Sequence, residues 1–293
     1  MKIKLMGTVT VEHDGAAPRH LSSTQVQTAL ARLVLDRAAG TSREGLADTL
    51  WPGELPDTWA AALRGVVSRV RTAVADPLRP PGATPLVARA GSYLLRLPDD
   101  AVVDLEQAER TVAAARTAYG EGAHAVARRY ASEAAGALRG SFLPSAEGDW
   151  AEETRERLAG QRLTALELAS RSAAALGDAH ESLRWANEAV RSAPLRESAH
   201  RCRIAAHAGA GNRAEALRAY HEVRTLLAEE MGIDPDCETQ ALYLDLLRSS
   251  ARPARPAPRR SPRRLPAPDL LGAFETPPAL AAPAFGALTA ASS

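Results

Sequence analysis

The sequence predicts a mainly α-helical protein with a small β component, organised as two folded parts and a tail. Short apolar runs with a period of two residues occur near the start, where they flank three helical stripes. The second part is helical throughout and contains an internal repeat with an offset of 34 residues. The last stretch is rich in Arg, Pro and Ala without a sustained period. We therefore predict domains over residues 1–98 and 104–248, followed by a disordered tail over residues 249–293.

Charge is unevenly distributed along the 293 residues, although the formal net charge is only +1. Residues 1–98 carry 12 Lys/Arg and 8 Asp/Glu, which gives +4. Residues 99–248 carry 18 and 25, which gives −7, and residues 249–293 carry 6 and 2, which gives +4. A basic first part suits a polyanionic partner, whereas the acidic second part would repel one.

Neither a membrane nor a disulfide framework is indicated by the sequence. No uninterrupted apolar run approaches the roughly 20 residues that cross a bilayer, and residues 1–7 lack the apolar core of a signal peptide. Cys202 and Cys237 both fall inside helical patterns, which argues against a zinc site as well. We therefore expect a cytoplasmic protein without a membrane partner.

The first part begins with strands and continues with helices. Apolar and polar residues alternate over residues 3–11, as in short strands. A helical stripe starts near Ser22 and is expected to end at Gly40. Thr41 and Glu44 then form a capping box that opens a short second helix.

A third helix is predicted over residues 57–75, with Asp57 as its cap, after a loop whose two prolines and glycine end the second helix. Its apolar stripe consists of Trp59, Leu63, Val66, Val67, Val70 and Val74. A loop rich in Pro and Gly follows as far as Pro85, and residues 86–89 and 93–97 then read as two strands joined by a turn. Strands, three helices and a terminal hairpin are the element order of a winged helix-turn-helix domain.

The second part shows the internal repeat most clearly at its turns. The pair Gly177-Asp178 recurs as Gly211-Asn212, 34 residues later. At the same offset Leu183 matches Leu217 and Ala186 matches Tyr220. This period predicts an all-α, tetratricopeptide-like array, in which helical hairpins bury their apolar faces by stacking on their neighbours.

Motifs along both parts match those of a known family. In the first part they are Leu-Ala-Asp-Thr-Leu-Trp-Pro at 46–52, Val-Ser-Arg-Val-Arg at 67–71 and Gly-Ser-Tyr at 91–93. In the second part they are Ala-Leu-Arg-Gly-Ser-Phe-Leu-Pro at 137–144, Pro-Leu-Arg-Glu-Ser-Ala-His at 194–200 and Leu-Leu-Ala-Glu-Glu-Met-Gly-Ile at 226–233. Residues 1–248 thus resemble the Streptomyces antibiotic regulatory protein family. In that family a winged helix of the response-regulator type, a phosphorelay-type output domain, precedes a bacterial transcriptional activator domain.

The resemblance implies a DNA-binding transcriptional activator of an antibiotic biosynthesis gene cluster that recruits RNA polymerase. Its partners would be double-stranded DNA, as direct repeats in a promoter, and a second protomer bound beside the first. In this family the loop between the second and third helices contacts polymerase. The corresponding residues are Trp51, Glu54, Leu55 and Asp57. Trp59, at the end of that loop, is expected to be a core anchor instead.

The polar face of helix 57–75 is the predicted DNA-reading surface. Small residues let a helix approach base edges, and flanking arginines reach phosphates or guanine. The predicted DNA contacts are Arg64, Ser68, Arg69, Arg71 and Thr72, with Arg89 and then Arg96 in the hairpin. Spacing alone suits a solvated helix face equally well, so the element order and the resemblance favour DNA. Ala61 and Gln27 depart from the polar and basic residues usual in the family at those positions, and both departures weaken the expected contacts.

No catalytic constellation is apparent, and we predict neither an enzyme nor a bound cofactor or metal. A Gly-rich phosphate loop ending in GKT or GKS does not occur. His200, Cys202 and His207 share a helix, but their spacing does not converge on one metal. The alternative to a DNA-binding regulator is a helical-repeat interaction adaptor whose winged helix binds DNA weakly or not at all. Salt separates the two, because phosphate-mediated binding weakens steeply as the salt concentration rises.

Overall fold

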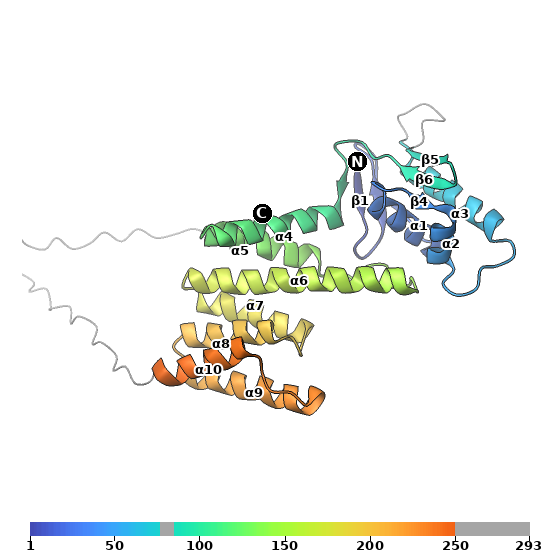
Figure 1. Ribbon diagram of the computed structural model, residues 1–293. Coiled ribbons are helices and arrows are strands. Elements are labelled where there is room, and N and C mark those ends of the chain that lie inside the picture. Colours follow the sequence, from blue (N-terminus) through green and yellow to red (C-terminus); the bar gives the residue numbers. More distant parts are fainter. Residues whose placement is uncertain (77–84, 250–293) are drawn as a thin grey trace, which may run out of the picture. The chain divides into compact units, whose positions relative to one another are not determined.

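The computed structural model of the chain describes residues 1–76 and 85–249 (Figure 1). The predicted loop over residues 77–84 and the predicted tail beyond residue 249 lie outside the described residues. The described residues form one compact unit by their contacts. Within it, strands and three helices come first and an array of helices follows, as the predicted fold class requires.

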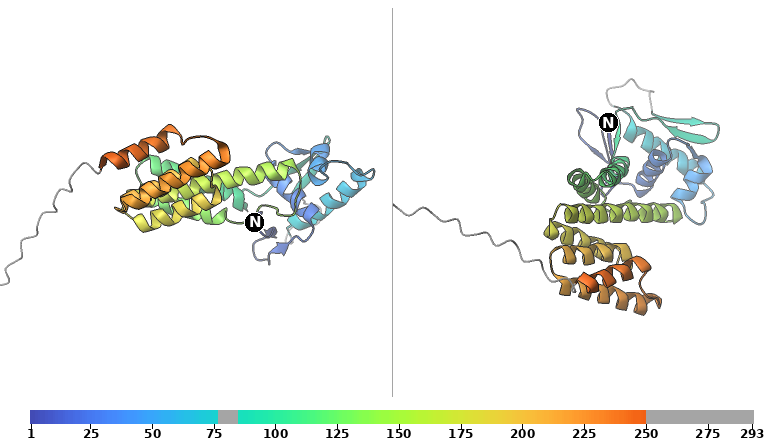
Figure 2. Two further views of the ribbon diagram at one scale, coloured as in Figure 1. Left: turned by 90° about the horizontal axis from the view of Figure 1, so that it is seen from below. Right: turned by 60° about the vertical axis from the view of Figure 1, so that its left-hand side comes forward.

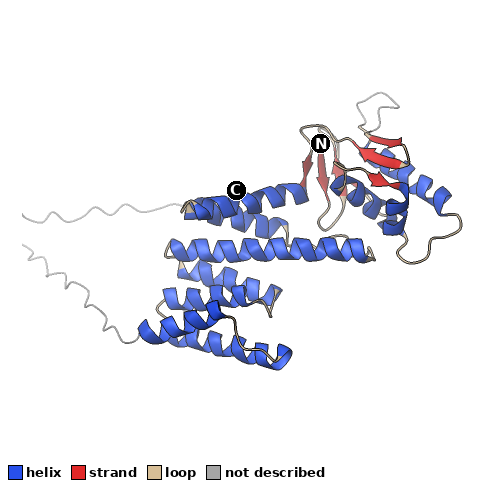
Figure 3. Cartoon of the chain, viewed as in Figure 1, coloured by secondary structure: helices blue, strands red, loops and turns tan. Residues whose placement is uncertain are grey.

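Seven short strands form two sheets in the first part of the described chain (Figure 3). The first sheet has the order β3-β2-β1-β7, and the second has the order β4-β6-β5. The strands are β1 (Lys2–Lys4), β2 (Thr10–Glu12), β3 (Arg19–His20), β4 (Thr41–Ser42), β5 (Leu86–Arg89), β6 (Ser92–Leu95) and β7 (Val102–Val103). Strand β7 pairs parallel to β1, with Ile3 opposite Val103. The first sheet is therefore completed by residues that lie beyond the predicted boundary at residue 98.

Three helices lie between these strands: α1 (Thr24–Leu35), α2 (Arg43–Leu50) and α3 (Trp59–Val74). The predicted apolar stripe of the third helix forms its buried face. Leu63, Val66, Val67, Val70 and Val74 are all buried. Trp59 is half-buried and packs against the same core. Fully burying side chains of this size contributes roughly 1.5–3 kcal/mol each, so this stripe fixes the orientation of α3.

The predicted capping box at the start of α2 is wrong. Ser42 is the N-cap residue, and its side chain accepts a hydrogen bond from the Gly45 backbone N–H. Thr41 lies in β4, where it pairs with Tyr93 of β6 and is buried. The pairing of two distant segments decided which of the two hydroxyl residues caps the helix.

The ends of the neighbouring helices also differ from the prediction. Helix α1 ends at Leu35, and Gly40 closes the turn after it with a φ of 79°. Thr58 rather than Asp57 is the N-cap of α3, and its side chain makes no capping hydrogen bond. Asp57 stays exposed in the preceding loop.

The second part is an array of consecutive helices that stack one after another (Figures 1 and 2). They are α4 (Asp104–Gly120), α5 (His124–Ala137), α6 (Asp149–Ala175), α7 (Ala179–Ser192), α8 (Glu197–Gly209), α9 (Arg213–Met231) and α10 (Cys237–Ser249). Small side chains let these helices approach closely. The buried face of α5, for example, consists of Ala127, Ala131, Ala134 and Ala135, at the spacing of one helix face. None of the described helices is long and apolar enough to cross a membrane.

The 34-residue offset relates equivalent positions of the array. Gly177 and Gly211 both take left-handed conformations, with φ of 76° and 77°, in turns between helices. Ala186 and Tyr220, one repeat apart, are both buried. Leu217, which the repeat predicted to be buried, is only half-buried at the edge of a small cluster around Tyr220. The offset of 34 residues therefore holds at the turns, but Leu217 is more exposed than the repeat predicts.

The two predicted domains share one hydrophobic core. Its buried residues run continuously from Met1 in the first part to Ala199 in α8. A second, smaller cluster holds Ile204, Tyr220 and Leu246. The division at residues 98 and 104 into independently folding domains therefore remains a prediction.

Candidate nucleic-acid interface

The exposed face of α3 carries most of the side chains predicted to contact DNA. Arg64, Ser68, Arg69 and Thr72 are all exposed, opposite the buried stripe of the same helix. Within the part of the chain that the structure describes, Arg64 and Arg69 form no ion pair or side-chain hydrogen bond. Gly65 is exposed between them. These two guanidinium groups, with the small residues Gly65, Ser68 and Thr72 between them on the helix face, can reach an anionic surface without breaking a contact within the described chain.

Arg71 is placed differently from the other predicted contacts. It is half-buried, and its Nε donates to the Leu86 carbonyl oxygen at 3.3 Å. This bond ties α3 to strand β5. Sequence reasoning missed a second arginine, Arg19, whose Nη1 donates to the Thr72 carbonyl oxygen at 2.8 Å and so satisfies the C-terminal end of α3. The partner of Arg19 is 53 residues away, so no local pattern signals it.

The predicted hairpin is present and carries Arg89 at its turn. Strands β5 and β6 pair with Arg89 opposite Ser92. The two residues between them, Ala90 and Gly91, both have positive φ, at 49° and 78°, as a two-residue hairpin turn requires. Arg89 is exposed on this turn. The Arg43 N–H donates to the Gly91 carbonyl oxygen at 3.0 Å, which anchors the hairpin to the start of α2.

The loop between α2 and α3 separates its predicted contact residues into two groups. Glu54, Leu55 and Asp57 are exposed, and Leu55 is one of the exposed large apolar side chains, at 39%. Trp51 is half-buried and packs against the core. Trp51 is therefore placed as the anchor of the loop, and the other three residues form its outer surface.

Hydrogen bonds donated by backbone N–H groups join the end of the first strand to the helical array. The Asp104 carboxylate accepts from the backbone N–H groups of Leu5 and Met6. The next residue, Gly7, donates its N–H to the Ser141 carbonyl oxygen at 3.0 Å. The end of β1 is thus held from both sides by the second part of the chain, a contact that sequence reasoning did not anticipate.

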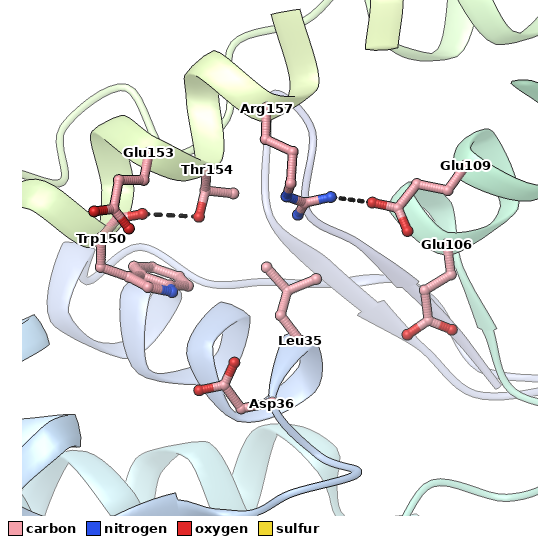
Figure 4. Close-up of a pocket in the computed structure, with 8 residues that line it drawn as sticks. All are labelled: Leu35, Asp36, Glu106, Glu109, Trp150, Glu153, Thr154 and Arg157. Carbon is pink, nitrogen blue, oxygen red and sulfur yellow. Dashed lines mark hydrogen bonds and ion pairs between the residues drawn. The ribbon is translucent and has the colours of Figure 1, made fainter. Parts of the chain in front are cut away.

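Ion pairs support the same junction at the end of α1 (Figure 4). Arg37 pairs with Glu106 of α4, and Arg157 of α6 points toward Glu109 of α4 and pairs with it. These helices border an open groove of about 470 Å³. Its lining is Leu35, Asp36, Glu106, Glu109, Trp150, Glu153, Thr154 and Arg157. Most charged side chains of the lining form ion pairs within the chain. These pairs hold α1, α4 and α6 together beside the groove.

His200 and Cys202 of α8 have structural environments. His200 is buried, and its Nε2 lies 2.6 Å from the Pro194 carbonyl oxygen. Burial raises the pKa of the Cys202 thiol to about 12, which leaves it protonated and unreactive. Among the described residues no group of three or more His, Cys, Asp or Glu side chains could hold a metal ion.

Comparison with known proteins identifies the helical array. Residues 103–247 match the bacterial transcriptional activator domain. The regulatory protein AfsR of Streptomyces griseus is 33% identical over 242 residues, which cover 82% of this chain and 24% of AfsR. AfsR of Streptomyces coelicolor is 30% identical over 249 residues, which cover 85% of this chain and 24% of that protein. The domain match and the AfsR relatives support the predicted place of this chain among regulators of the Streptomyces antibiotic regulatory protein family.

The chain is also similar to the solved structure of another regulatory protein. The structure of Mycobacterium tuberculosis EmbR in complex with a low affinity phosphopeptide superposes with a TM-score of 0.76 at 26% identity, covering 85% of this chain and 65% of EmbR. The chain therefore spans about a quarter of the length of AfsR and about two thirds of EmbR. The names of these relatives describe regulatory proteins, in agreement with the regulatory role predicted from the sequence.

Proposed function

We propose that this chain is a sequence-specific DNA-binding activator of transcription, acting in the cytoplasm on a gene cluster for a secondary metabolite such as an antibiotic. The observation that carries the proposal is the exposed face of α3, where Arg64 and Arg69 have no partner among the residues that the structure describes. A helix that displays small residues between two free arginines is suited to the major groove. Family membership supplies the gene-regulatory context.

The proposed contacts divide by chemistry. Ser68 and Arg69, near the middle of α3, would read base edges or adjacent phosphates. Arg64 and Thr72 would hold the helix in register. Thr72 would do so by accepting from a base amino group, because its hydroxyl donates to the Ser68 carbonyl oxygen at 3.1 Å and a phosphodiester offers no donor. Arg89, exposed at the hairpin turn, would meet the phosphates or the minor groove beside the helix.

Arg71 has a supporting role in this proposal. Its Nε already donates to Leu86, so its main effect would be to hold the hairpin against α3. The helical array, with a sequence charge of −7 over residues 99–248, would face away from the DNA. Two protomers would bind direct repeats side by side, and the outer residues of the α2–α3 loop would contact RNA polymerase.

Binding of the full chain to a promoter fragment, measured over a range of salt concentrations, tests the proposal. Arg64→Ala and Arg69→Ala should each reduce the slope of log affinity against log salt by about one if the side chain meets a phosphate. A side chain that reads a base should instead cost about 1–3 kcal/mol at one base pair. Arg191→Ala, which removes an exposed arginine of α7, is the matched control and should leave the affinity unchanged.

The same titration separates this function from that of a helical-repeat adaptor. An adaptor would show weak DNA binding that neither α3 variant alters. Unchanged affinity in both variants, together with an unchanged salt slope, would remove α3 from the interface and leave the adaptor as the better account.

A further inference from the structure

The loop between α2 and α3 lies tightly against the start of α6 at Gly148. Gly148 is the N-cap residue of α6, with φ of 94° and ψ of 161°. A Cβ atom added to Gly148 would lie 2.8 Å from the Pro52 Cβ and 3.3 Å from its Cγ. Real Cβ atoms essentially never come within 3.0 Å of another heavy atom, so the ring of Pro52 rests directly on the backbone of Gly148.

Gly148 differs in this respect from the glycines that close the turns of the array. Gly122, Gly177 and Gly211 also have positive φ, between 76° and 77°, but an added Cβ would meet nothing within 4 Å at any of them. Those glycines are needed only for the backbone conformation. Gly148 meets two demands at once, since its conformation excludes a side chain and Pro52 occupies the space that a side chain would need.

The segment that carries Gly148 is held firmly from behind. Arg155 of α6 donates to the carbonyl oxygens of Phe142 at 3.0 Å and of Leu143 at 2.6 Å, and also to that of Ala146. These bonds fix the connection between α5 and α6. A small cavity of about 130 Å³ beside the contact is lined from both sides, by residues of α1, α2 and the loop and by residues 145–147 of the connection. Pro52 thus rests on a rigid support that belongs to the helical array.

We propose that Gly148 is a positioning residue that acts through Pro52 to hold the α2–α3 loop, and with it Glu54, Leu55 and Asp57, in the place where a protein partner meets it. The helical array then determines how far activation proceeds once DNA is bound. This inference rests on the proposed function for its partner, RNA polymerase, but the contact itself can be tested without a partner.

The contact is tested by the rate at which a glutamate-specific protease cuts the full chain at Glu54. Glu121, in the turn after α4 and exposed like Glu54, is the internal reference. Pro52→Ala opens the ring and removes the Cγ that lies against Gly148, although it keeps the Cβ. Gly148→Ala forces the loop away. Each should raise cutting at Glu54 relative to Glu121 about three- to tenfold, because local opening becomes more frequent.

The functional arm measures promoter affinity and transcription with purified RNA polymerase. Pro52→Ala and Gly148→Ala should each lower transcription at saturating protein about fivefold and leave DNA affinity within about twofold. The double variant should be no worse than the more severe single variant, because both changes break the same contact. Gly211→Ala is the control: it places a Cβ on a left-handed residue in open space, far along the chain from both cleavage sites, and should change neither the cutting ratio nor transcription.

Two results would overturn the inference while leaving the proposed function intact. One is wild-type transcription by Pro52→Ala. The other is a loss of transcription that merely follows a loss of DNA affinity. If the unaltered chain neither binds the promoter nor activates, the proposed function fails. The cutting ratio then still decides whether Gly148 positions the loop, since it needs neither DNA nor polymerase.

Discussion

Both carboxylate oxygens of Asp104 lie 3.0 Å from the backbone nitrogen of Leu5, a residue 99 positions earlier in the chain. One of them also accepts from the Met6 N–H at 3.0 Å. Asp104 is the first residue of α4 and Leu5 follows β1. A single side chain therefore bonds to the backbone directly after β1 and belongs to the first residue of the helical array.

Replacing this carboxylate should destabilise the whole unit. Asp104→Ala leaves the N–H groups of Leu5 and Met6 without their acceptor, so we expect a loss of about 2–4 kcal/mol in the free energy of unfolding. Urea unfolding at neutral pH measures it. Asp48→Ala, an exposed position on α2, should stay within about 0.5 kcal/mol of the unaltered chain. Equal stability of the two variants would show that the carboxylate does not join the parts in solution.

Arg69→Ala and Arg71→Ala should have different consequences. Arg69 is exposed and Arg71 donates to Leu86, so Arg69→Ala should weaken DNA binding more and Arg71→Ala should lower stability more. We expect the stability loss for Arg71→Ala to be about 0.5–1.5 kcal/mol, as for an ordinary hydrogen bond. Titration of a promoter fragment and thermal unfolding of both variants check the two expectations. A larger affinity loss for Arg71→Ala would mean that its side chain turns outward to the DNA.

Two leucines of α9 provide a matched test of the repeat register. Leu227 is 1% exposed, whereas Leu217 is half-buried. Leu227→Ala should cost about 2–5 kcal/mol in unfolding free energy, as for a fully buried truncation. Leu217→Ala should cost roughly 1–2 kcal/mol, because less apolar area leaves water at that site. Denaturant unfolding of both variants measures the difference, and the reverse order would mean that the register of α9 is wrong.

Stability should fall below neutral pH because of His200. Burial lowers the pKa of this imidazole from its ordinary value of 6.5, more than the hydrogen bond to Pro194 raises it. The unfolded chain therefore takes up the proton first, so stability starts to fall as the pH drops past 6.5 and the loss is complete below the lowered pKa of the folded state. His200→Gln should flatten this part of the pH profile of urea unfolding. An unchanged profile would assign the acid sensitivity to other groups.

The sequence by itself determined the local features of this protein. The spacing of Leu63, Val66, Val67, Val70 and Val74 fixed which face of α3 is buried, and so fixed which residues of α3 are exposed. The paired turns at Gly177 and Gly211 were visible as a repeat, because glycine is the residue that most readily adopts a left-handed conformation. Such features depend on residues a few positions apart, and periodicity reports them directly.

The tertiary structure alone decided where distant segments meet. Pairing of Thr41 with Tyr93 moved the cap of α2 to Ser42, and the nearby Leu86 carbonyl turned Arg71 inward. The bond between Asp104 and Leu5 joined two predicted domains into one core. Each outcome depends on which of several similar polar groups lies nearest after folding. That choice is set by packing across about a hundred residues of chain, whereas a periodic pattern records only which side of its own helix or strand a residue occupies.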